Sequence, residues 1–303
     1  MSVDQVRNDA AWLENELDVQ MPEVIMEAYP QRTYASVFPL EPGLDPGMKS
    51  VTYLHAQGVG TAKFVEPTSR EVPLVEFDVI PETAVLSTLR LGFEYTAEDV
   101  EAGRFTGRPL DRDKMLTTME GHEKAIDETA WIGSPARKIY GIANHPNAIR
   151  LATSTTFDAN STPAAILAAL NLMSAKQDAL TLGSEEGNTL AVSRTAFKYI
   201  AQTQYSVSGS GDTRTILEAY RAGNPQIDMV VGVHWLATAG AGSSAVAVLF
   251  DRSRNKIGHL LALRPTRDPI AWDGTVYRQV VRSKTGGVKA KKPFSIVILE
   301  GIE

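Results

Sequence analysis

The segment that most constrains the fold is a stretch of about thirty residues in which polar and apolar side chains alternate. Residues 49–80 follow the period of two long β-strands, and residues 67–70 supply a turn between them. At ~3.3 Å per residue, arms of about thirteen residues would reach on the order of 40 Å, whereas ordinary strands have about five or six residues. A two-stranded ribbon is only marginally stable in water. Unless the rest of the chain folds over it, this ribbon needs another molecule, and copies of the same protein are the simplest supply.

Composition allows a large folded protein and excludes several kinds of site. A length of 303 residues fits one large or two ordinary domains, and 43% hydrophobic with 22% charged residues is near the globular average. The net charge of −6 disfavours a dedicated nucleic-acid binder, which normally presents a basic face to the phosphates. The absence of cysteine excludes disulfides, thiolate nucleophiles and cysteine-ligated metals.

The first fifty residues predict an arm. Residues 1–18 lack the basic start and apolar core of a signal peptide, and no apolar run approaches the ~18 residues of a membrane span, so we expect synthesis in the cytoplasm and no membrane partner. An amphipathic helix is predicted within residues 4–19, and it would dock either on another subunit or on its own core. Its apolar stripe consists of Val6, Ala10, Leu13 and Leu17. Five prolines between residues 22 and 46 then predict an extended segment.

The remaining chain predicts an alternation of helices and strands. Thr96 and Asp99 mark the start of a short helix that ends at Gly103. A long helix follows, which begins near Asp111 and ends around Gly133 and Pro135, and some twenty residues at about 1.5 Å each give a rod of about 30 Å. Further helices are predicted from residue 161 to Gly183, with Leu180 on the apolar stripe, and over residues 193–202 and 213–222. Strands are predicted over residues 189–192, 227–233, 245–250, 256–263, 275–284 and 288–299, the last two joined as a hairpin by Thr285, Gly286 and Gly287.

No motif for catalysis or for a cofactor is complete. His122 begins a zinc-protease pattern whose second histidine is replaced by Ile126, so we interpret it as a polar residue on a packed helix and predict no metal and no cofactor. Asp111 and Asp113 favour capping of the long helix over metal binding. Gly58 and Gly60 lack the following helix that a dinucleotide site needs. The cluster Lys289, Lys291 and Lys292 is typical of a solvated strand edge, with phosphate contact as the alternative.

The order of these parts resembles the major capsid proteins of tailed bacteriophages, which have the α+β Hong Kong 97-type fold. The resemblance covers nearly the whole chain and extends to a capsid family formerly described only as a domain of unknown function. The segments that carry it are DPGMKSVTY (45–53), GVGTAKFV (58–65), IDETAWIG (126–133), GIANHPN (141–147) and RSKTGGVKAKKP (282–293).

The resemblance implies a division into parts. Residues 1–48 would be the N-terminal arm and residues 49–80 the extended loop that lies over a neighbouring subunit. Residues 81–151 and 271–303 would form the peripheral domain with a spine helix at about 111–131, and residues 152–270 the axial domain. We expect contacts between subunits at Val6, Leu13, Leu17, Tyr53, Lys63, Phe64 and Arg70.

The resemblance also implies a function and partners. The chain would self-assemble through pentamers and hexamers into an icosahedral shell around double-stranded DNA, in a virion with a portal and either a separate scaffold or cement protein or none. The DNA would be contacted weakly, because the chain is acidic. Some relatives crosslink a loop lysine to an asparagine; Lys63 matches by location alone, and no crosslink is predicted.

Two alternatives stay open. The first is an encapsulin-like compartment of the same fold, which a neighbouring cargo gene would distinguish from a phage. The second, from a different class, is a soluble α/β hydrolase or transferase whose site gathers dispersed residues such as Asp212, His234 and Ser243. The enzyme would be a small oligomer with a concave polar pocket.

Overall fold

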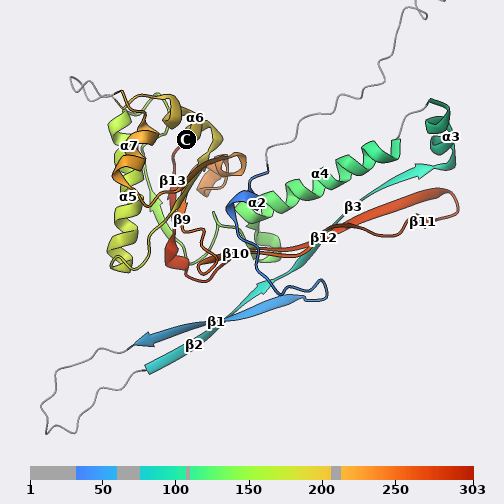
Figure 1. Ribbon diagram of the computed structural model, residues 1–303, viewed down its shortest axis with the longest axis horizontal. Coiled ribbons are helices and arrows are strands. Elements are labelled where there is room, and N and C mark those ends of the chain that lie inside the picture. The colour runs from blue at the N-terminus through green and yellow to red at the C-terminus, as the bar shows by residue number, and fades with distance from the viewer. Residues whose placement is uncertain (1–31, 60–75, 107–109, 206–212) are drawn as a thin grey trace, which may run out of the picture.

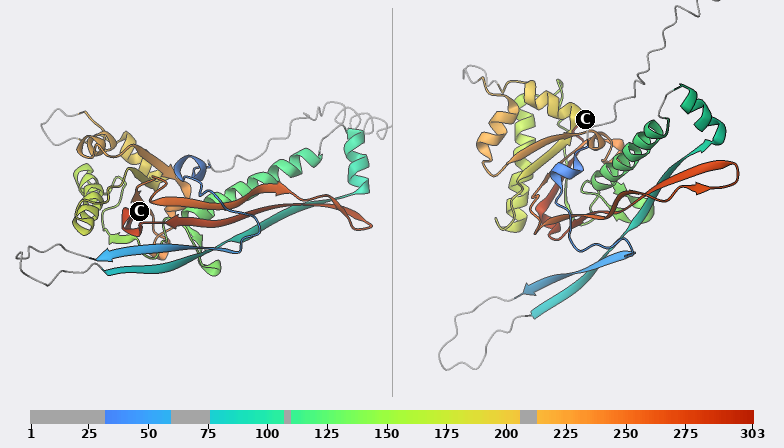
Figure 2. Two further views of the ribbon diagram at one scale, coloured as in Figure 1. Left: turned by 60° about the horizontal axis from the view of Figure 1, so that its bottom comes forward. Right: turned by 45° about the vertical axis from the view of Figure 1, so that its right-hand side comes forward.

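The computed structural model describes residues 32–59, 76–106, 110–205 and 213–303. The molecule is elongated (Figures 1 and 2), with a helix-covered sheet at one end and a long ribbon of strands under one helix at the other. The α-helices are α2 (Tyr34–Val37), α3 (Ala97–Thr106), α4 (Leu110–Trp131), α5 (Pro163–Thr181), α6 (Arg194–Gln202) and α7 (Ile216–Gly223). The 3₁₀ helices are η1 (Pro135–Arg137), η2 (His234–Ala237), η3 (Ala241–Ser243) and η4 (Pro293–Ser295).

The strands form four separate sheets. The two-stranded pairs are β1 (Ser50–Val59) with β2 (Glu76–Val85), and β4 (Gly133–Ser134) with β5 (Ile139–Tyr140). The long ribbon contains β3 (Ser87–Thr96), β10 (Ile257–Arg267), β11 (Ala271–Trp272) and β12 (Val276–Ala290). The five-stranded sheet contains β6 (Ile149–Ala152), β13 (Ile296–Glu300), β9 (Val246–Phe250), β7 (Thr189–Ser193) and β8 (Met229–Val233), in that order.

Both faces of the five-stranded sheet are buried, which explains the nearly continuous apolar runs of its central strands. On β9, Val248 and Phe250 face one cluster and Leu249 faces the other, and β13 alternates in the same way. Helices α5, α6 and α7 cover the second cluster. Each begins at a hydroxyl cap, since the side chains of Thr162, Ser193 and Thr215 accept backbone N–H groups of the first turn.

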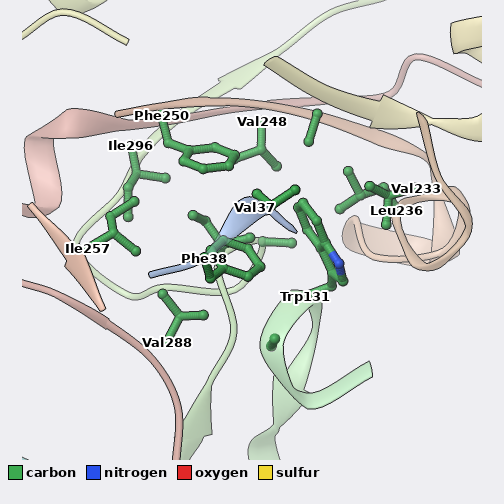
Figure 3. Close-up of a cluster of buried hydrophobic side chains, with 14 of the residues drawn as sticks. Val37, Phe38, Trp131, Val233, Leu236, Val248, Phe250, Ile257, Val288 and Ile296 are labelled. Carbon is green, nitrogen blue, oxygen red and sulfur yellow. The ribbon is translucent and has the colours of Figure 1, made fainter. Parts of the chain in front are cut away.

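The first cluster joins the arm, the long helix and both large sheets. Phe38 lies against Trp131 with 4.8 Å between ring centroids and 5.8 Å from Phe250, and the Trp131 and Phe250 rings also meet edge-on at 6.5 Å (Figure 3). Val37 and Val248 fill the space around these rings. All of these side chains are almost fully buried, so the arm supplies part of the core.

Helix α4 packs on the ribbon through a buried histidine. His122 Nδ1 lies 2.9 Å from Ser283 Oγ, and His122 Nε2 lies 2.9 Å from the Val281 carbonyl oxygen. Met115, Ile126 and Ala130 share this buried side of the helix. The interpretation of His122 as a polar residue on a packed helix agrees with these contacts.

The predicted terminal hairpin is wrong. Residues 276–290 form one continuous strand through Gly286 and Gly287, and β13 pairs with β6 and β9 instead. The glycines form a bulge, because His259 pairs with Val288 whereas Leu261 pairs with Thr285. Gly287 has φ of +74°, and a Cβ there would lie 2.3 Å from the Tyr140 carbonyl oxygen. The dipeptide that resembles a turn therefore permits a close backbone approach inside a strand.

Most other predicted elements are confirmed within the described residues. The α3 cap forms as predicted, since the Asp99 N–H donates to Thr96 Oγ1 and the Thr96 N–H to Asp99 Oδ2, but the helix continues past Gly103 to Thr106. Leu180 is 62% exposed and lies outside the buried stripe of α5. The described part of the arm, predicted to be extended, contains the helical turn α2, and the helix predicted within residues 4–19 lies outside the described residues.

We predict that Gly287→Ala destabilises the subunit by about 3 kcal/mol, because it adds left-handed backbone strain to a clash with the Tyr140 carbonyl. The measurement is thermal and urea unfolding of the purified full chain. Gly223→Ala is the matched control, since a Cβ at the end of α7 meets nothing within 4 Å. Equal stability of both variants would contradict the assignment of Gly287.

Candidate assembly surfaces

The arm is held on α4 by one buried carboxylate. Asp127 Oδ1 accepts the backbone N–H groups of Thr33 (3.1 Å) and Tyr34 (2.8 Å), and Asp127 Oδ2 accepts Trp235 Nε1 (2.8 Å). Trp131 Nε1 donates to Thr33 Oγ1 at 2.8 Å. The carboxylate joins three elements that are far apart in sequence, so the arm, α4 and η2 are fixed together.

The arm then runs along the start of β10. The His259 N–H donates to the Pro39 carbonyl at 2.8 Å, and the Glu41 N–H donates to the His259 carbonyl at 3.0 Å. The His259 ring is fully buried, meets the Tyr34 ring edge-on at 5.3 Å, and lies 3.4 Å from Thr285 Oγ1. Burial lowers the pKa of His259 to about 4. Burial likewise holds the pKa of His122 below its ordinary value.

The lysine cluster at the end of β12 is a solvated edge only at Lys292, which is 57% exposed, and the prediction is corrected for Lys289 and Lys291. Lys289 is nearly buried, and Lys291 Nζ lies 3.0 Å from Glu41 Oε2. Lys292 Nζ lies 2.7 Å from Glu185 Oε1. Burial alone would raise the pKa of Glu185, but hydrogen bonds from Lys256 and Lys292 more than offset it, and the pKa lies below its usual value. The lysines are thus occupied by carboxylates of their own chain.

The base of the β1–β2 hairpin is anchored on the body. Lys289 Nζ lies 4.2 Å from the centroid of the Tyr53 ring, a cation–π contact. Lys284 Nζ donates to the Pro46 carbonyl at 2.8 Å. Leu86, the one residue between β2 and β3, is buried against Leu260. The direction in which the hairpin leaves the body is therefore set by β12.

Beyond its base the hairpin has no described strand beside it. Its ten paired positions run from Ser50 opposite Val85 to Val59 opposite Glu76. Thr52 and Thr83 share one face, where their hydroxyls lie 3.0 Å apart, and Leu54 on the same face is 68% exposed. In Figures 1 and 2 the β1–β2 pair projects away from the ribbon as a separate two-stranded hairpin. A long strand pair with unpaired edges and an exposed leucine is typical of a surface that another chain covers.

The opposite end of the molecule also exposes aromatic side chains. Tyr277 lies 4.4 Å from Trp272 and 5.3 Å from Tyr95, as ring centroids, and Trp272 is half exposed. Phe105 on α3 is 94% exposed. Figure 1 places α3 at the far end from α5–α7. Exposed rings at the tip of an elongated body are candidates for contact with other copies.

One of the predicted contact residues lies in the described part of the chain. Tyr53 contacts Lys289 of its own chain, and its role between subunits stays a prediction. The others lie outside the described residues; they are Val6, Leu13, Leu17, Lys63, Phe64 and Arg70. Neither Leu54 nor Phe105 was predicted from the sequence. Leu54 has a usable signal, because it is an apolar residue at a strand position that faces away from the core.

The residues of the enzyme alternative give no shared site. His234 is exposed on η2 with its ring 5.7 Å from Trp235, Ser243 lies on η3, and Asp212 lies outside the described residues. Within residues 32–59, 76–106, 110–205 and 213–303, His, Asp and Glu side chains form no group of three that could hold a metal ion. None of the helices described is both long and apolar enough to cross a membrane.

We predict that Asp127→Asn destabilises the subunit by about 2 kcal/mol. Both carboxylate oxygens accept hydrogen bonds from N–H groups, so the NH₂ group of an asparagine would face at least one N–H donor and leave it without an acceptor. The measurement is urea unfolding of the full chain, with limited proteolysis near residue 33. Glu128→Gln, exposed on the next position of α4, is the control and is expected to have no effect. Unchanged stability of Asp127→Asn would contradict the role of this carboxylate.

We predict that acid destabilises the subunit through His259. Its pKa is 6.5 ordinarily and about 4 when folded, so between these values only the unfolded chain binds the proton, and stability falls as pH falls. The loss from pH 7 to pH 5 is about 2 kcal/mol. Unfolding at several pH values should show this dependence in the natural chain and in the exposed control His234→Gln, and a weaker one in His259→Gln. The same dependence in all three would contradict it.

Comparison with known proteins gives the family. A family model described as "Major capsid protein" matches residues 60–302. Among solved structures, the capsid of Myoviridae phage XM1 matches with a TM-score of 0.83 and 14% identity, over 95% of this chain and 97% of that one. A chain from a structure of Mycobacterium phage Ogopogo matches with a TM-score of 0.64 and 16% identity, over 95% of this chain and 98% of that one.

More distant particles share the fold. The virus-like particle from Pyrococcus furiosus matches with a TM-score of 0.56 and 12% identity, over 89% of this chain and 92% of that one. No protein of curated function matches the sequence. The fold is the α+β Hong Kong 97-type capsid fold that the sequence predicts. The chain belongs to the major capsid protein family, and it is a structural subunit of a capsid shell.

Proposed function

We propose that many copies of this chain assemble, through pentamers and hexamers, into an icosahedral shell that encloses double-stranded DNA. The observation that carries the proposal is the β1–β2 hairpin, which is anchored at its base and open at both edges. A ribbon of this kind is stabilised by lying on a neighbour. Contacts that are each modest become strong when every copy repeats them in a closed lattice.

The parts of the subunit have different roles in this proposal. Residues 49–80 lie over a neighbouring subunit, and α4 with the ribbon forms the peripheral domain. The five-stranded sheet with α5–α7 forms the axial domain, which points to the five-fold and six-fold centres. Strand β13 lies in this sheet, although the predicted division assigns residues 271–303 to the peripheral domain. We therefore include β13 in the axial domain.

The partners follow from the same proposal. The net charge of −6 supports weak contact with packaged DNA. A portal, and a scaffold or cement protein where one is used, complete the particle, and the subunit is made in the cytoplasm of the host. The match to a virus-like particle keeps an encapsulin-like compartment as the second candidate. Terminase and portal genes beside this gene would favour the phage, and a cargo enzyme gene would favour the compartment.

We predict that shortening the hairpin prevents assembly without unfolding the subunit. Replacing residues 57–78 by Asn-Gly joins the paired residues Ala56 and Val79 through a two-residue turn and leaves the base intact. Particle yield in sedimentation and negative-stain microscopy should fall at least about tenfold, because the repeated contact is lost.

Two controls separate the ribbon from other effects. Circular dichroism and thermal unfolding should match the natural chain, because Tyr53, Lys289 and Leu86 are retained. A Gly-Ser linker of equal length in place of residues 57–78 should also fail to assemble, which excludes chain length as the cause. Normal particles from either variant would contradict the proposed role of the hairpin.

A further inference from the structure

One face of the ribbon sets two arginines directly opposite each other. In the register of β3 with β12, Arg90 pairs with Arg282, Gly92 with Val280, and Glu94 with Arg278. These residues point away from α4, because the intervening positions Val281 and Ser283 contact His122. Like charges opposite each other in a sheet destabilise it. The isolated subunit therefore gains no stability from placing these two arginines opposite each other.

Neighbouring carboxylates compensate only part of this charge. Arg282 Nε lies 2.8 Å from Asp268 Oδ1, and Arg278 Nε lies 2.6 Å from Glu94 Oε1. Arg90 is exposed and forms no ion pair with any residue in the described part of the chain. A guanidinium held in place by a strand and left without a carboxylate is suited to bind one from another molecule.

A depression of about 400 Å³ lies beside the unpaired arginine. Gly92 and Val280 lie between the row of Arg90 and the row of Arg278, and the lining also includes Leu91, Phe93 and Glu94, whose carboxylate pairs with Arg278. A side chain at position 92 would come within 2.8 Å of the Gln279 carbonyl, so glycine keeps the floor open. Flat guanidinium groups on both sides favour an aromatic ring between them.

Helix α3 of the same chain carries groups that match this surface. Glu98, Glu101 and Phe105 are all exposed, and their spacing of three and four places them on one helix face. Glu101 and Phe105 are separated by about 6 Å along the helix, and the rows of Arg90 and Gly92 by about 7 Å along the strand. Two carboxylates and a ring can thus meet the arginine pair and the depression together.

The contact has to be between copies. Arg90 lies six positions before Thr96, at the end of β3, so about 20 Å of strand separates it from the start of α3. In Figure 1 α3 lies at the tip of the ribbon, at the far end from α5–α7.

We propose that α3 of one subunit docks on the Arg90–Arg282 face of the next, with Phe105 in the depression over Gly92 and with Glu98 and Glu101 on the arginines. This inference rests on the proposed function, because it assigns one contact of the shell. The two surfaces differ, so the contact is heterologous and closes into a ring when the rotation between subunits closes.

The test is a charge exchange in the full chain. Arg90→Glu alone and Glu101→Arg alone should each reduce the yield of particles at least about tenfold, and the double variant should recover most of it. Phe105→Ser should also reduce the yield. Arg137→Glu, at an exposed position on η1 and outside the proposed axial domain, is the control and should assemble normally. Normal assembly of the single variants, or no recovery in the double variant, would overturn the proposal.

A second measurement does not depend on yield. The chain has no cysteine, so Arg90→Cys with Glu101→Cys provides one defined pair. A bis-maleimide crosslinker that spans about 10 Å should give covalent oligomers from assembled particles in denaturing gels, because two long side chains in contact hold their Cα atoms beyond the about 7 Å that a disulfide bridges. Particles that form but give only monomers would refute this contact while leaving the shell function intact. Failure of the natural chain to form particles with its neighbouring gene products would instead refute the proposed function.

Discussion

The structure depends on strand β12, which runs for fifteen residues through both ends of the molecule. It pairs with β3 on one side and with β10 and β11 on the other, and α4 lies across it through His122. Near its end Lys284 and Lys289 hold the base of the β1–β2 hairpin. A single strand therefore fixes the relative directions of the hairpin, the ribbon and the helix. The bulge at Gly286 and Gly287 lets this strand pass close to Tyr140 without ending.

The arm completes the core before it leads into the hairpin. Phe38 packs against both Trp131 and Phe250, which also contact each other, and Asp127 holds the backbone just before it. Because the chain goes from this buried segment to Ser50 within twelve residues, the hairpin begins from a fixed point. Its outer part has few contacts with the body, so its position depends on what lies beside it. A β1–β2 hairpin that is fixed at its base and projects from the body suits a subunit that contacts several neighbours.

The sequence predicts most elements because their signals are local. The hydroxyl caps at Thr96, Thr162 and Ser193 and the period of α4 are visible in a few consecutive residues. The prediction of a terminal hairpin is wrong because Thr285–Gly287 has the composition of a turn, and only the contact with the distant Tyr140 shows why glycine is needed there. The prediction that Lys289 is solvated is wrong for the same reason, since its partners Glu41 and Tyr53 are far away in the sequence. The Arg90–Arg282 pair depends on strand register, which composition does not specify.

The β1–β2 hairpin, the exposed Arg90 and the exposed Phe105 all lie away from the core, on surfaces that we propose other copies cover. The most direct measurement is electron cryomicroscopy of particles formed by the full chain together with its neighbouring gene products. We expect closed shells in which each β1–β2 hairpin lies on an adjacent copy. A protein that stays monomeric in every preparation, or shells in which each hairpin lies on its own body, would contradict this expectation.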